Sequence, residues 1–343
     1  MTEPNKETVA ARLGLVAEYR AWLDFLEALG AAPGGVPLVG RDEAESLLRQ
    51  VGLDEPDLGA ILAELPSRSG QPELWWLLER CYHGVLRDIG QSGAGAMRSW
   101  PSLPEGLGEP GRYFWIWVYA AAVPDIRRWH REHGIGEDVS LSTLGDLGRH
   151  VRLCRRRTGR VGFDEQFWFS LHFRGDLFEL GRLQFNPYAL ASGPAGPLFW
   201  YDATAAAVLG DGLSPGEPAL GVHIPESGPL TPSACDASFQ AAREFFADLF
   251  PDQRYRVATC TSWLMDDQLL EYLDPVDNIV LFQRRFELVP GALDADYSPL
   301  RFVFHKELSE LDQIVPRTRL EHALFDHLAA GKHWRMRTGW LRL

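Results

Sequence analysis

Residues 221–238 read GVHIPESGPLTPSACDAS, and this stretch decides the fold of the second half of the chain. Apolar residues at 219–224 predict a short strand before it, and the spacing of apolar residues predicts a helix at 236–250. A strand–loop–helix order offers unpaired backbone N–H groups and the positive end of a helix dipole to an anion. Gly228 lets the backbone approach a ligand closely. The same residues would also suit a rigid turn that binds nothing.

From about residue 160 onward, the pattern around this stretch alternates strands with helices. Residues 167–173 (FWFSLHF) and 178–185 (FELGRLQF) predict two strands joined by a tight turn at 174–176. A Gly/Pro/Ala-rich stretch at 189–218 is expected to form a flap. Further strands are expected at 255–263, 278–288, 300–305 and 333–341, and further helices at 266–273 and 317–330. This order predicts an α/β (α+β) fold with a mixed sheet flanked by helices.

The first third of the chain has helical periodicity and no convincing strand. Residues 113–119 predict a buried aromatic helix, which Pro124 is expected to interrupt. A chain of 343 residues is long for one compact domain. We therefore expect a helical N-terminal domain at 1–135 and a mixed α/β domain at 136–343.

Composition narrows the classes of partner. The net charge of −13 disfavours general nucleic-acid binding and attachment to anionic membranes, both of which need clustered Lys and Arg. The N-terminus lacks a signal-peptide pattern, and no apolar run approaches the ~20 residues that span a bilayer, so a cytoplasmic location is expected. The four cysteines have no C-x-x-C pair, which disfavours a disulfide scaffold and a structural zinc site.

Several short strings resemble a signature of bacterial GNAT-like acyltransferases that carry a helical N-terminal domain. These are His223-Ile224-Pro225, Gly228-Pro229-Leu230, Cys235-Asp236 with Ser238, CTSWL at 260–264, and Asn278-Ile279 followed by Phe282. The order of elements from 139 to 343 is also similar to a GNAT core, whereas the first third resembles the family only loosely.

The resemblance implies transfer of an acyl group from a thioester donor to an amine. The donor would be acyl-CoA or an acyl group on the phosphopantetheine of an acyl carrier protein. GNAT proteins usually carry a Q/R-x-x-G-x-G/A loop between the fourth strand and the third helix. Here residues 223–234 take that place without the motif, so the resemblance leaves the carrier open.

Two groups of side chains could carry the proton transfers that amide formation needs. Glu226 and His223 lie where the strand enters the loop, within reach of a substrate amine, and either could be the base. Ser262 and Asp267 lie at the end of a later strand, where GNAT folds place groups near the thioester. The simpler interpretations are a solvated loop carboxylate for Glu226 and a hydrogen-bonded strand histidine for His223.

A third candidate is Cys235. Ser233 and Asp236 have capping-box spacing, which predicts that the helix begins near Cys235. A helix N-terminus lowers the pKa of a thiol, so Cys235 could be a nucleophile with His223 as its base. The alternative is a small buried apolar residue.

Donor binding is expected at the loop and at an arginine cluster. The expected contacts at the loop and the strand after it are Ile224, Gly228, Leu230, Ser233 and Trp263, the last of which could instead be core. Six arginines fall between residues 149 and 160, with no acid among them: Arg149, Arg152, Arg155, Arg156, Arg157 and Arg160. Arg156 and Arg157 in particular could hold phosphates or an acidic carrier protein. The cluster could equally complement a helix dipole.

No metal is expected, since His130 with His133, and His322 with His327, lack a third ligand and the H-E-x-x-H spacing. The function hypothesis is an N-acyltransferase that works by direct attack, on a small-molecule or peptide amine, with the helical domain shaping one wall of the cleft. Two alternatives stay open: a catalytically inactive module that binds a carrier protein or peptide, and a ping-pong acyltransferase using Cys235.

Overall fold

The structure is a computed structural model that describes residues 1–343 except 1–2, 39, 94–99, 191–192, 195–199 and 202–215. It divides into two compact units, Met1–Asp176 and Leu177–Leu343. The division lies later than the boundary expected at 135/136, because the helices that follow residue 136 belong to the first unit. Most of the stretch expected to be a flap, 189–218, lies outside the described residues.

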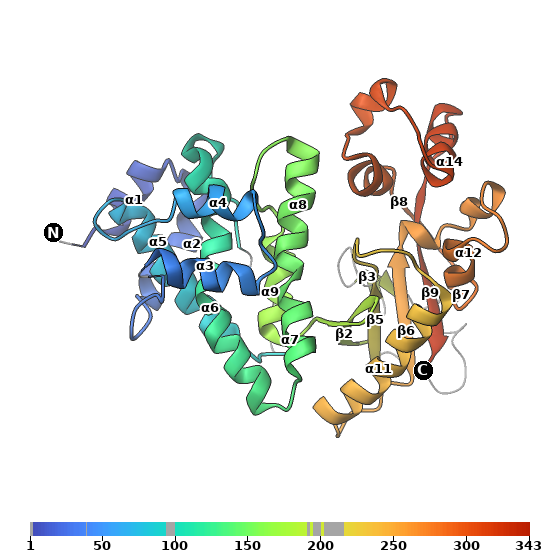
Figure 1. Cartoon of the computed structure of the whole chain (residues 1–343), viewed down its shortest axis with the longest axis horizontal. Coiled ribbons are helices and arrows are strands. Elements are labelled where there is room, and N and C mark those ends of the chain that lie inside the picture. The colour runs from blue at the N-terminus through green and yellow to red at the C-terminus, as the bar shows by residue number, and fades with distance from the viewer. Residues whose placement is uncertain (1–2, 39, 94–99, 191–192, 195–199, 202–215) are drawn as a thin grey trace. The chain divides into compact units, whose positions relative to one another are not determined.

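The described part of the first unit is helical (Figure 1). Its α-helices are α1 (Lys6–Leu13), α2 (Arg20–Leu29), α3 (Arg41–Gln50), α4 (Asp57–Ala63), α5 (Pro72–Asp88), α6 (Gly108–Glu132), α7 (Glu137–Leu144), α8 (Asp146–Thr158) and α9 (Gln166–Arg174). The predicted aromatic segment at 113–119 is fully buried within α6. Pro124 does not interrupt α6, because buried Val123, Ile126 and His130 hold both sides of the proline in the core.

The segment FWFSLHF, predicted as a strand, forms helix α9 instead. Phe169 and Phe173 lie four residues apart on one face, and both rings pack on Tyr119 at 5.0 and 5.2 Å between centroids. Gly175 ends the helix with a φ of 73°. The hairpin lies inside the next predicted strand, where Leu180 pairs with Leu183 across a two-residue turn.

The second unit is built on a mixed sheet in the order β1-β2-β5-β6-β9-β7, with β8 pairing to β9. Its strands are β1 (Phe178–Leu180), β2 (Leu183–Ala189), β5 (Pro218–His223), β6 (Val257–Ser262), β7 (Glu287–Leu288), β8 (Leu293–Asp294) and β9 (Arg335–Arg342). A separate ribbon joins β3 (Gly193–Pro194) to β4 (Trp200–Tyr201). The pairs within the sheet are antiparallel except β5–β6. The predicted α/β (α+β) fold with a mixed sheet is confirmed.

Helix α11 (Pro232–Leu249) connects β5 to β6 and lies along the sheet beside them (Figure 1). Phe239 of α11 packs on Phe185 of β2 at 5.7 Å between centroids. Alternate residues of β2, including Gln184 and Asn186, therefore face away from α11. His223 is paired with Gln184 across the ladder, so it also lies on the face away from α11.

Three predicted elements after β6 are corrected by the structure. Residues 278–288 form helix α12 (Asn278–Gln283) followed by β7, and 300–305 form a π-helical turn (Leu300–Phe304) after α13 (Tyr297–Pro299). The helix predicted at 266–273 is a 3₁₀ helix (Asp267–Glu271), and α14 (Arg319–Ala329) matches its prediction. Short apolar runs do not distinguish strand from helix. Here packing decides, since these segments share one core cluster that includes Leu269, Val280, Leu300, Leu324 and Trp334.

The core of the first unit holds a histidine kept neutral by burial. His130 is 0% exposed, and its Nδ1 lies 2.7 Å from Ser140 Oγ. Burial, with a smaller contribution from the nearby His172, lowers the pKa of His130 from 6.5 to about 4. As the pH falls through this interval, the unfolded chain binds this proton before the folded chain does. Acid therefore destabilises the fold through His130.

We predict that His130→Gln flattens this pH dependence. In the wild type, the His130 contribution to the free energy of unfolding should fall by about 3 kcal/mol as the pH drops from about 7 to about 4. Denaturant unfolding at both pH values gives the free energy of unfolding of the wild type and of the variant, and the difference between them is the His130 contribution. His322→Gln, at an exposed histidine, is the control. Equal pH slopes for wild type and His130→Gln would show that this histidine is not held neutral.

Candidate active site

The site begins where strands β5 and β6 separate. Their pairing consists of Leu220 with Ala258 and Gly221 with Thr259, yet β5 continues to His223 and β6 to Ser262. Beyond these pairs, β6 is bonded only to β9 among the described strands. Beyond the opening, β5 and β6 no longer pair with each other, although β5 stays paired with β2 and β6 with β9, and the chain leaves the sheet from β5 at this point.

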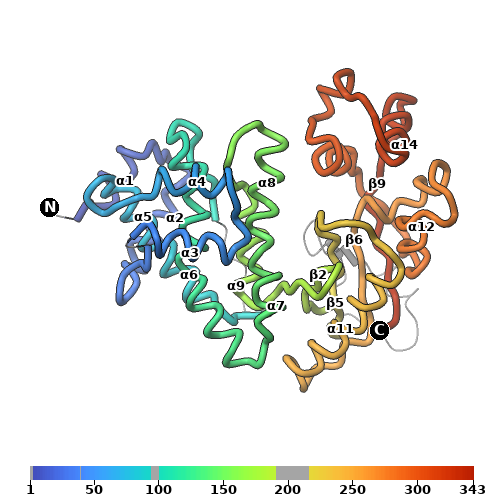
Figure 2. Tube along the Cα trace, in the orientation of Figure 1, coloured from blue at the N-terminus to red at the C-terminus, as the bar shows by residue number. Residues whose placement is uncertain are grey.

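The β5–α11 loop (residues 224–231) runs from this opening to the start of α11 (Figure 2). Thr231 is the N-cap of the helix and accepts a hydrogen bond from the Ala234 N–H, so α11 begins at Pro232. The start predicted near Cys235 from the Ser233–Asp236 spacing is therefore wrong. Proline at the first helical position has no N–H to satisfy, and its fixed φ suits a helix start.

Few backbone N–H groups in the first turn of α11 are available to bind a ligand. The Ala234 N–H bonds to Thr231 Oγ1, and the Cys235 N–H bonds to the Thr231 carbonyl at 3.0 Å. Pro232 has no N–H, which leaves the Ser233 N–H as the donor that the first turn can offer to a ligand. Ser233 is exposed at that position.

Within the β5–α11 loop, the predicted residues differ in exposure. Glu226 and Gly228 are exposed, Ile224 is half-buried and Leu230 is buried. Gly228 has a φ of +107°, which a residue with a side chain rarely adopts. An alanine there would strain the loop, and the predicted close approach of this backbone to a ligand stays a prediction.

The loop is held by an arginine that sequence reasoning did not single out. Arg182, in the β1–β2 turn, donates hydrogen bonds to the carbonyls of Pro225, Gly228 and Pro229 at 2.7–3.2 Å. The sequence signal for this turn was the glycine at 181, inside the stretch expected to be one strand. In the structure Gly181 has a φ of +75°, which fits a hairpin turn.

His223 has a defined partner on the face of the sheet away from α11. Its Nε2 lies 2.8 Å from Asn186 Oδ1 on β2. An amide oxygen can only accept, so Nε2 carries the proton and the ring lone pair is on Nδ1. His223 therefore has the tautomer that a base with an oriented ring requires. A second contact on the same face joins Tyr188 of β2 to Thr259 of β6, at 2.5 Å between Oη and Oγ1.

The candidates at the end of β6 make structural contacts. Ser262 Oγ accepts a hydrogen bond from the Leu264 N–H at 3.1 Å and caps the short helix that follows. Asp267 accepts from Arg335 at 2.9 Å and from Arg337 at 2.7 Å. Trp263 is buried in the apolar cluster of this unit. These contacts account for all three side chains without a substrate.

Cys235 is fully buried, and burial raises the pKa of its thiol despite the nearby guanidinium groups of Arg285 and Arg182. Burial also raises the pKa of Cys260 to about 12. A nucleophilic cysteine needs access and a lowered pKa, and Cys235 has neither. The structure favours the apolar packing role over the nucleophile.

The arginine cluster lies on and just after helix α8 of the first unit. Arg149 pairs with Asp146 at 2.9 Å, Arg155 with Asp57 at 3.0 Å, and Arg157 with Asp164. Arg152 donates to the carbonyl of Gly52 at 2.9 Å. Arg156 and Arg160 are exposed. Three of the six arginines thus contact neighbouring segments of the first unit, and Arg149 pairs within α8, which favours the structural interpretation.

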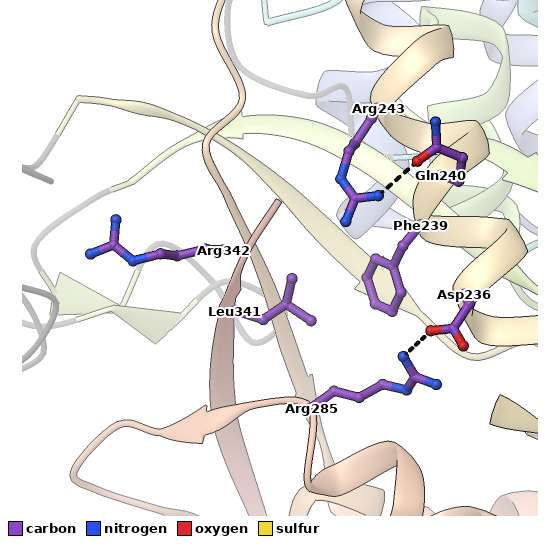
Figure 3. A pocket seen from close by; sticks show the side chains of 7 residues that line it. All are labelled: Asp236, Phe239, Gln240, Arg243, Arg285, Leu341 and Arg342. Atoms are coloured by element: carbon purple, nitrogen blue, oxygen red, sulfur yellow. Dashed lines mark hydrogen bonds and ion pairs between the residues drawn. The ribbon is translucent and has the colours of Figure 1, made fainter.

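A pocket of about 530 Å³ lies on the flank of α11 (Figure 3). Arg243, Arg285 and Arg342 line it together with Asp236 and Gln240. Arg285 forms an ion pair with Asp236, and Arg243 donates to Gln240 at 3.0 Å, as the dashed lines in Figure 3 show. Side chains of α11 thus hold two of its three guanidinium groups, and none of the lining residues was a predicted site residue.

In the described ranges, no three His, Cys, Asp or Glu side chains are grouped so that they could hold a metal ion. Among the helices that the structure describes, none has the length and apolar character needed to cross a bilayer.

Comparison with known proteins gives consistent matches over both units. Residues 42–175 match the N-acyltransferase N-terminal domain, and residues 177–341 match the GNAT-like C-terminal domain. These matches meet where the two compact units divide. No curated protein matches the chain significantly.

Solved structures of an acyltransferase are similar over almost the whole chain. One, in complex with decanoyl-CoA and teicoplanin, is 40% identical, with a TM-score of 0.86 over 99% of this chain and 100% of that chain. A second, with CoA and 10C-teicoplanin, is 39% identical at the same TM-score and coverage. A third, with decanoyl-CoA, is 37% identical, again at that TM-score and coverage.

We predict that thiol reagents leave Cys235 unmodified in the folded protein. Because its thiol is buried and its pKa is raised, alkylation by iodoacetamide near pH 8 should be at least about a hundredfold slower than in denaturant. Peptide mass mapping after timed labelling measures the rate at each cysteine. Rapid labelling of Cys235 in the native protein would restore it as a candidate nucleophile.

Proposed function

Because the chain belongs to the acyltransferases that join an N-acyltransferase N-terminal domain to a GNAT-like C-terminal domain, we propose that it moves an acyl group from acyl-CoA to an amine by direct attack. The full-length likeness to an acyltransferase bound to decanoyl-CoA carries the proposal. The resemblance seen in the sequence is confirmed at the level of the family, and the chain is an acyltransferase.

Two observations favour coenzyme A over an acyl carrier protein as the donor. The similar structures hold decanoyl-CoA, octanoyl-CoA or CoA. Three of the six arginines suggested as a dock for an acidic carrier are paired with acids of their own unit. We infer a donor with a medium-length acyl chain, bound at the opening between β5 and β6 and at the β5–α11 loop.

The acceptor is inferred from the same comparison. One similar structure contains teicoplanin and another 10C-teicoplanin. We propose that this chain also acylates an amine of a glycopeptide. A small-molecule or peptide amine is the broader class to which such an acceptor belongs.

The proposed reaction forms one C–N bond and breaks one C–S bond. The amine nitrogen attacks the thioester carbon, and a base removes a proton from the nitrogen. Backbone N–H groups near the opening stabilise the tetrahedral oxyanion. The CoA thiolate then leaves and takes up a proton.

We assign the base to His223. Asn186 Oδ1 accepts a hydrogen bond from the His223 Nε2–H group and orients the ring, which keeps the basic lone pair on Nδ1. Glu226 is exposed in the loop and is the second candidate base. The buried Cys235, with its raised pKa, argues against a covalent acyl-enzyme.

We predict that wild-type protein converts decanoyl-CoA and a teicoplanin-type amine into free CoA and the amide. His223→Ala should lower kcat by about a hundredfold because the base is lost. Asn186→Asp should instead move the acid limb of kcat/KM to higher pH, since a carboxylate next to Nε2 raises the pKa of the imidazole. Liquid chromatography with mass spectrometry measures the product, and His322→Ala is the surface control.

Three outcomes would decide among the alternatives. Unchanged kcat in His223→Ala, with a loss in Glu226→Gln, would transfer the role of base to Glu226. An acyl adduct on wild type that is absent from Cys235→Ala would establish ping-pong chemistry. Tight binding of decanoyl-CoA without turnover of any amine would indicate an inactive binding module.

A further inference from the structure

The β1–β2 turn is fixed to helix α11. The turn consists of Gly181 and Arg182, because Leu180 pairs directly with Leu183. The Arg182 N–H donates to Ser238 Oγ at 2.7 Å, and Ser238 is fully buried on α11. A Cβ at Gly181 would lie 3.0 Å from the same oxygen. The turn and the helix thus approach each other closely, and the hydrogen bond to Ser238 holds the backbone of Arg182 against α11.

The guanidinium group of Arg182 contacts several backbone carbonyls of the β5–α11 loop. Nη2 donates to the Gly228 carbonyl at 2.7 Å and Nη1 to the Pro225 carbonyl at 2.9 Å. Nε lies 3.0 Å from the Gly228 carbonyl and 3.2 Å from that of Pro229. A planar fork with five N–H donors can hold several carbonyls at once, which an ammonium group does less well.

These bonds set the direction of the peptide groups in the loop. In a trans peptide the C=O and the following N–H point in opposite directions. The carbonyls of Pro225 and Pro229 face Arg182, so the N–H groups of Glu226 and Leu230 point away from it. The negative ends of these peptide dipoles are turned toward the guanidinium, and the positive ends toward the other side of the loop. An anion would meet N–H groups there rather than carbonyls.

We infer that Arg182 is a positioning residue for the thioester donor. It holds the β5–α11 loop in the conformation that binds the phosphates of acyl-CoA, without itself being the phosphate ligand. This inference rests on the proposed function, since it takes acyl-CoA as the donor. It adds a residue from the β1–β2 turn that belongs to neither the loop nor the helix.

The test compares Arg182→Ala, Arg182→Lys and a matched control. Arg284→Ala removes an exposed arginine of the same unit whose Nη1 donates to the Pro275 carbonyl at 3.0 Å, outside the loop. In Arg182→Ala, the Kd and KM for decanoyl-CoA should rise by about tenfold to a hundredfold, because a loosened loop must be ordered on binding. The kcat at saturating donor and the KM for the amine should change less than about threefold. Arg182→Lys should recover part of the loss, and Arg284→Ala should match wild type.

A second readout separates positioning from direct contact. Hydrogen exchange of residues 224–231 in the free protein should become faster in Arg182→Ala than in wild type, before any donor is added. Unchanged exchange in the loop, or an unchanged Kd for decanoyl-CoA in Arg182→Ala, would overturn this inference alone. If wild-type protein does not bind decanoyl-CoA at all, the proposed function fails, and the inference fails with it.

Discussion

Two parallel strands, β5 and β6, pair through Gly221 and Thr259 and then separate, and the architecture of the second unit follows from this opening. Parallel neighbours need a crossover, which α11 supplies. The crossover helix must begin beside the strand ends, so its first turn and the loop before it lie next to the point where β5 and β6 stop pairing with each other. Antiparallel partners on both sides, β2 and β9, fix the two strands so that the opening does not close by further pairing.

The contacts of the arginines favour the loop, rather than the arginine cluster, as the proposed site for an anionic donor. The chain has a net charge of −13, and most arginines of α8 pair with acids of the first unit. Arg182 instead contacts backbone carbonyls, which carry no net charge. Through these contacts Arg182 orients the carbonyls of Pro225, Gly228 and Pro229 in the loop.

The sequence predicted the mixed sheet, the strand–loop–helix stretch and the helical first unit, because each rests on long periodic patterns or on Gly and Pro at turn positions. It failed on short apolar segments such as 167–173 and 278–288, where strand and helix patterns coincide and tertiary packing decides. At the candidate site, His223 and Gly228 could be proposed from the sequence because they lie in the informative stretch itself. Asn186 on β2 and Arg182 in the β1–β2 turn lie about 40 residues earlier in the chain, and only the register of β1, β2 and β5 brings them to the loop. Burial, which argues against Cys235 as the nucleophile, is equally a property of the folded chain.

The most direct test of the account is hydrogen exchange of the full-length protein with and without decanoyl-CoA. If the donor binds where β5 and β6 separate, amides in 218–231 and 257–262 should exchange at least about tenfold more slowly with the donor present. The arginine-bearing segment 149–160 should change little. Protection confined to 149–160, with none in the two strand segments or the loop, would contradict the placement of the donor site.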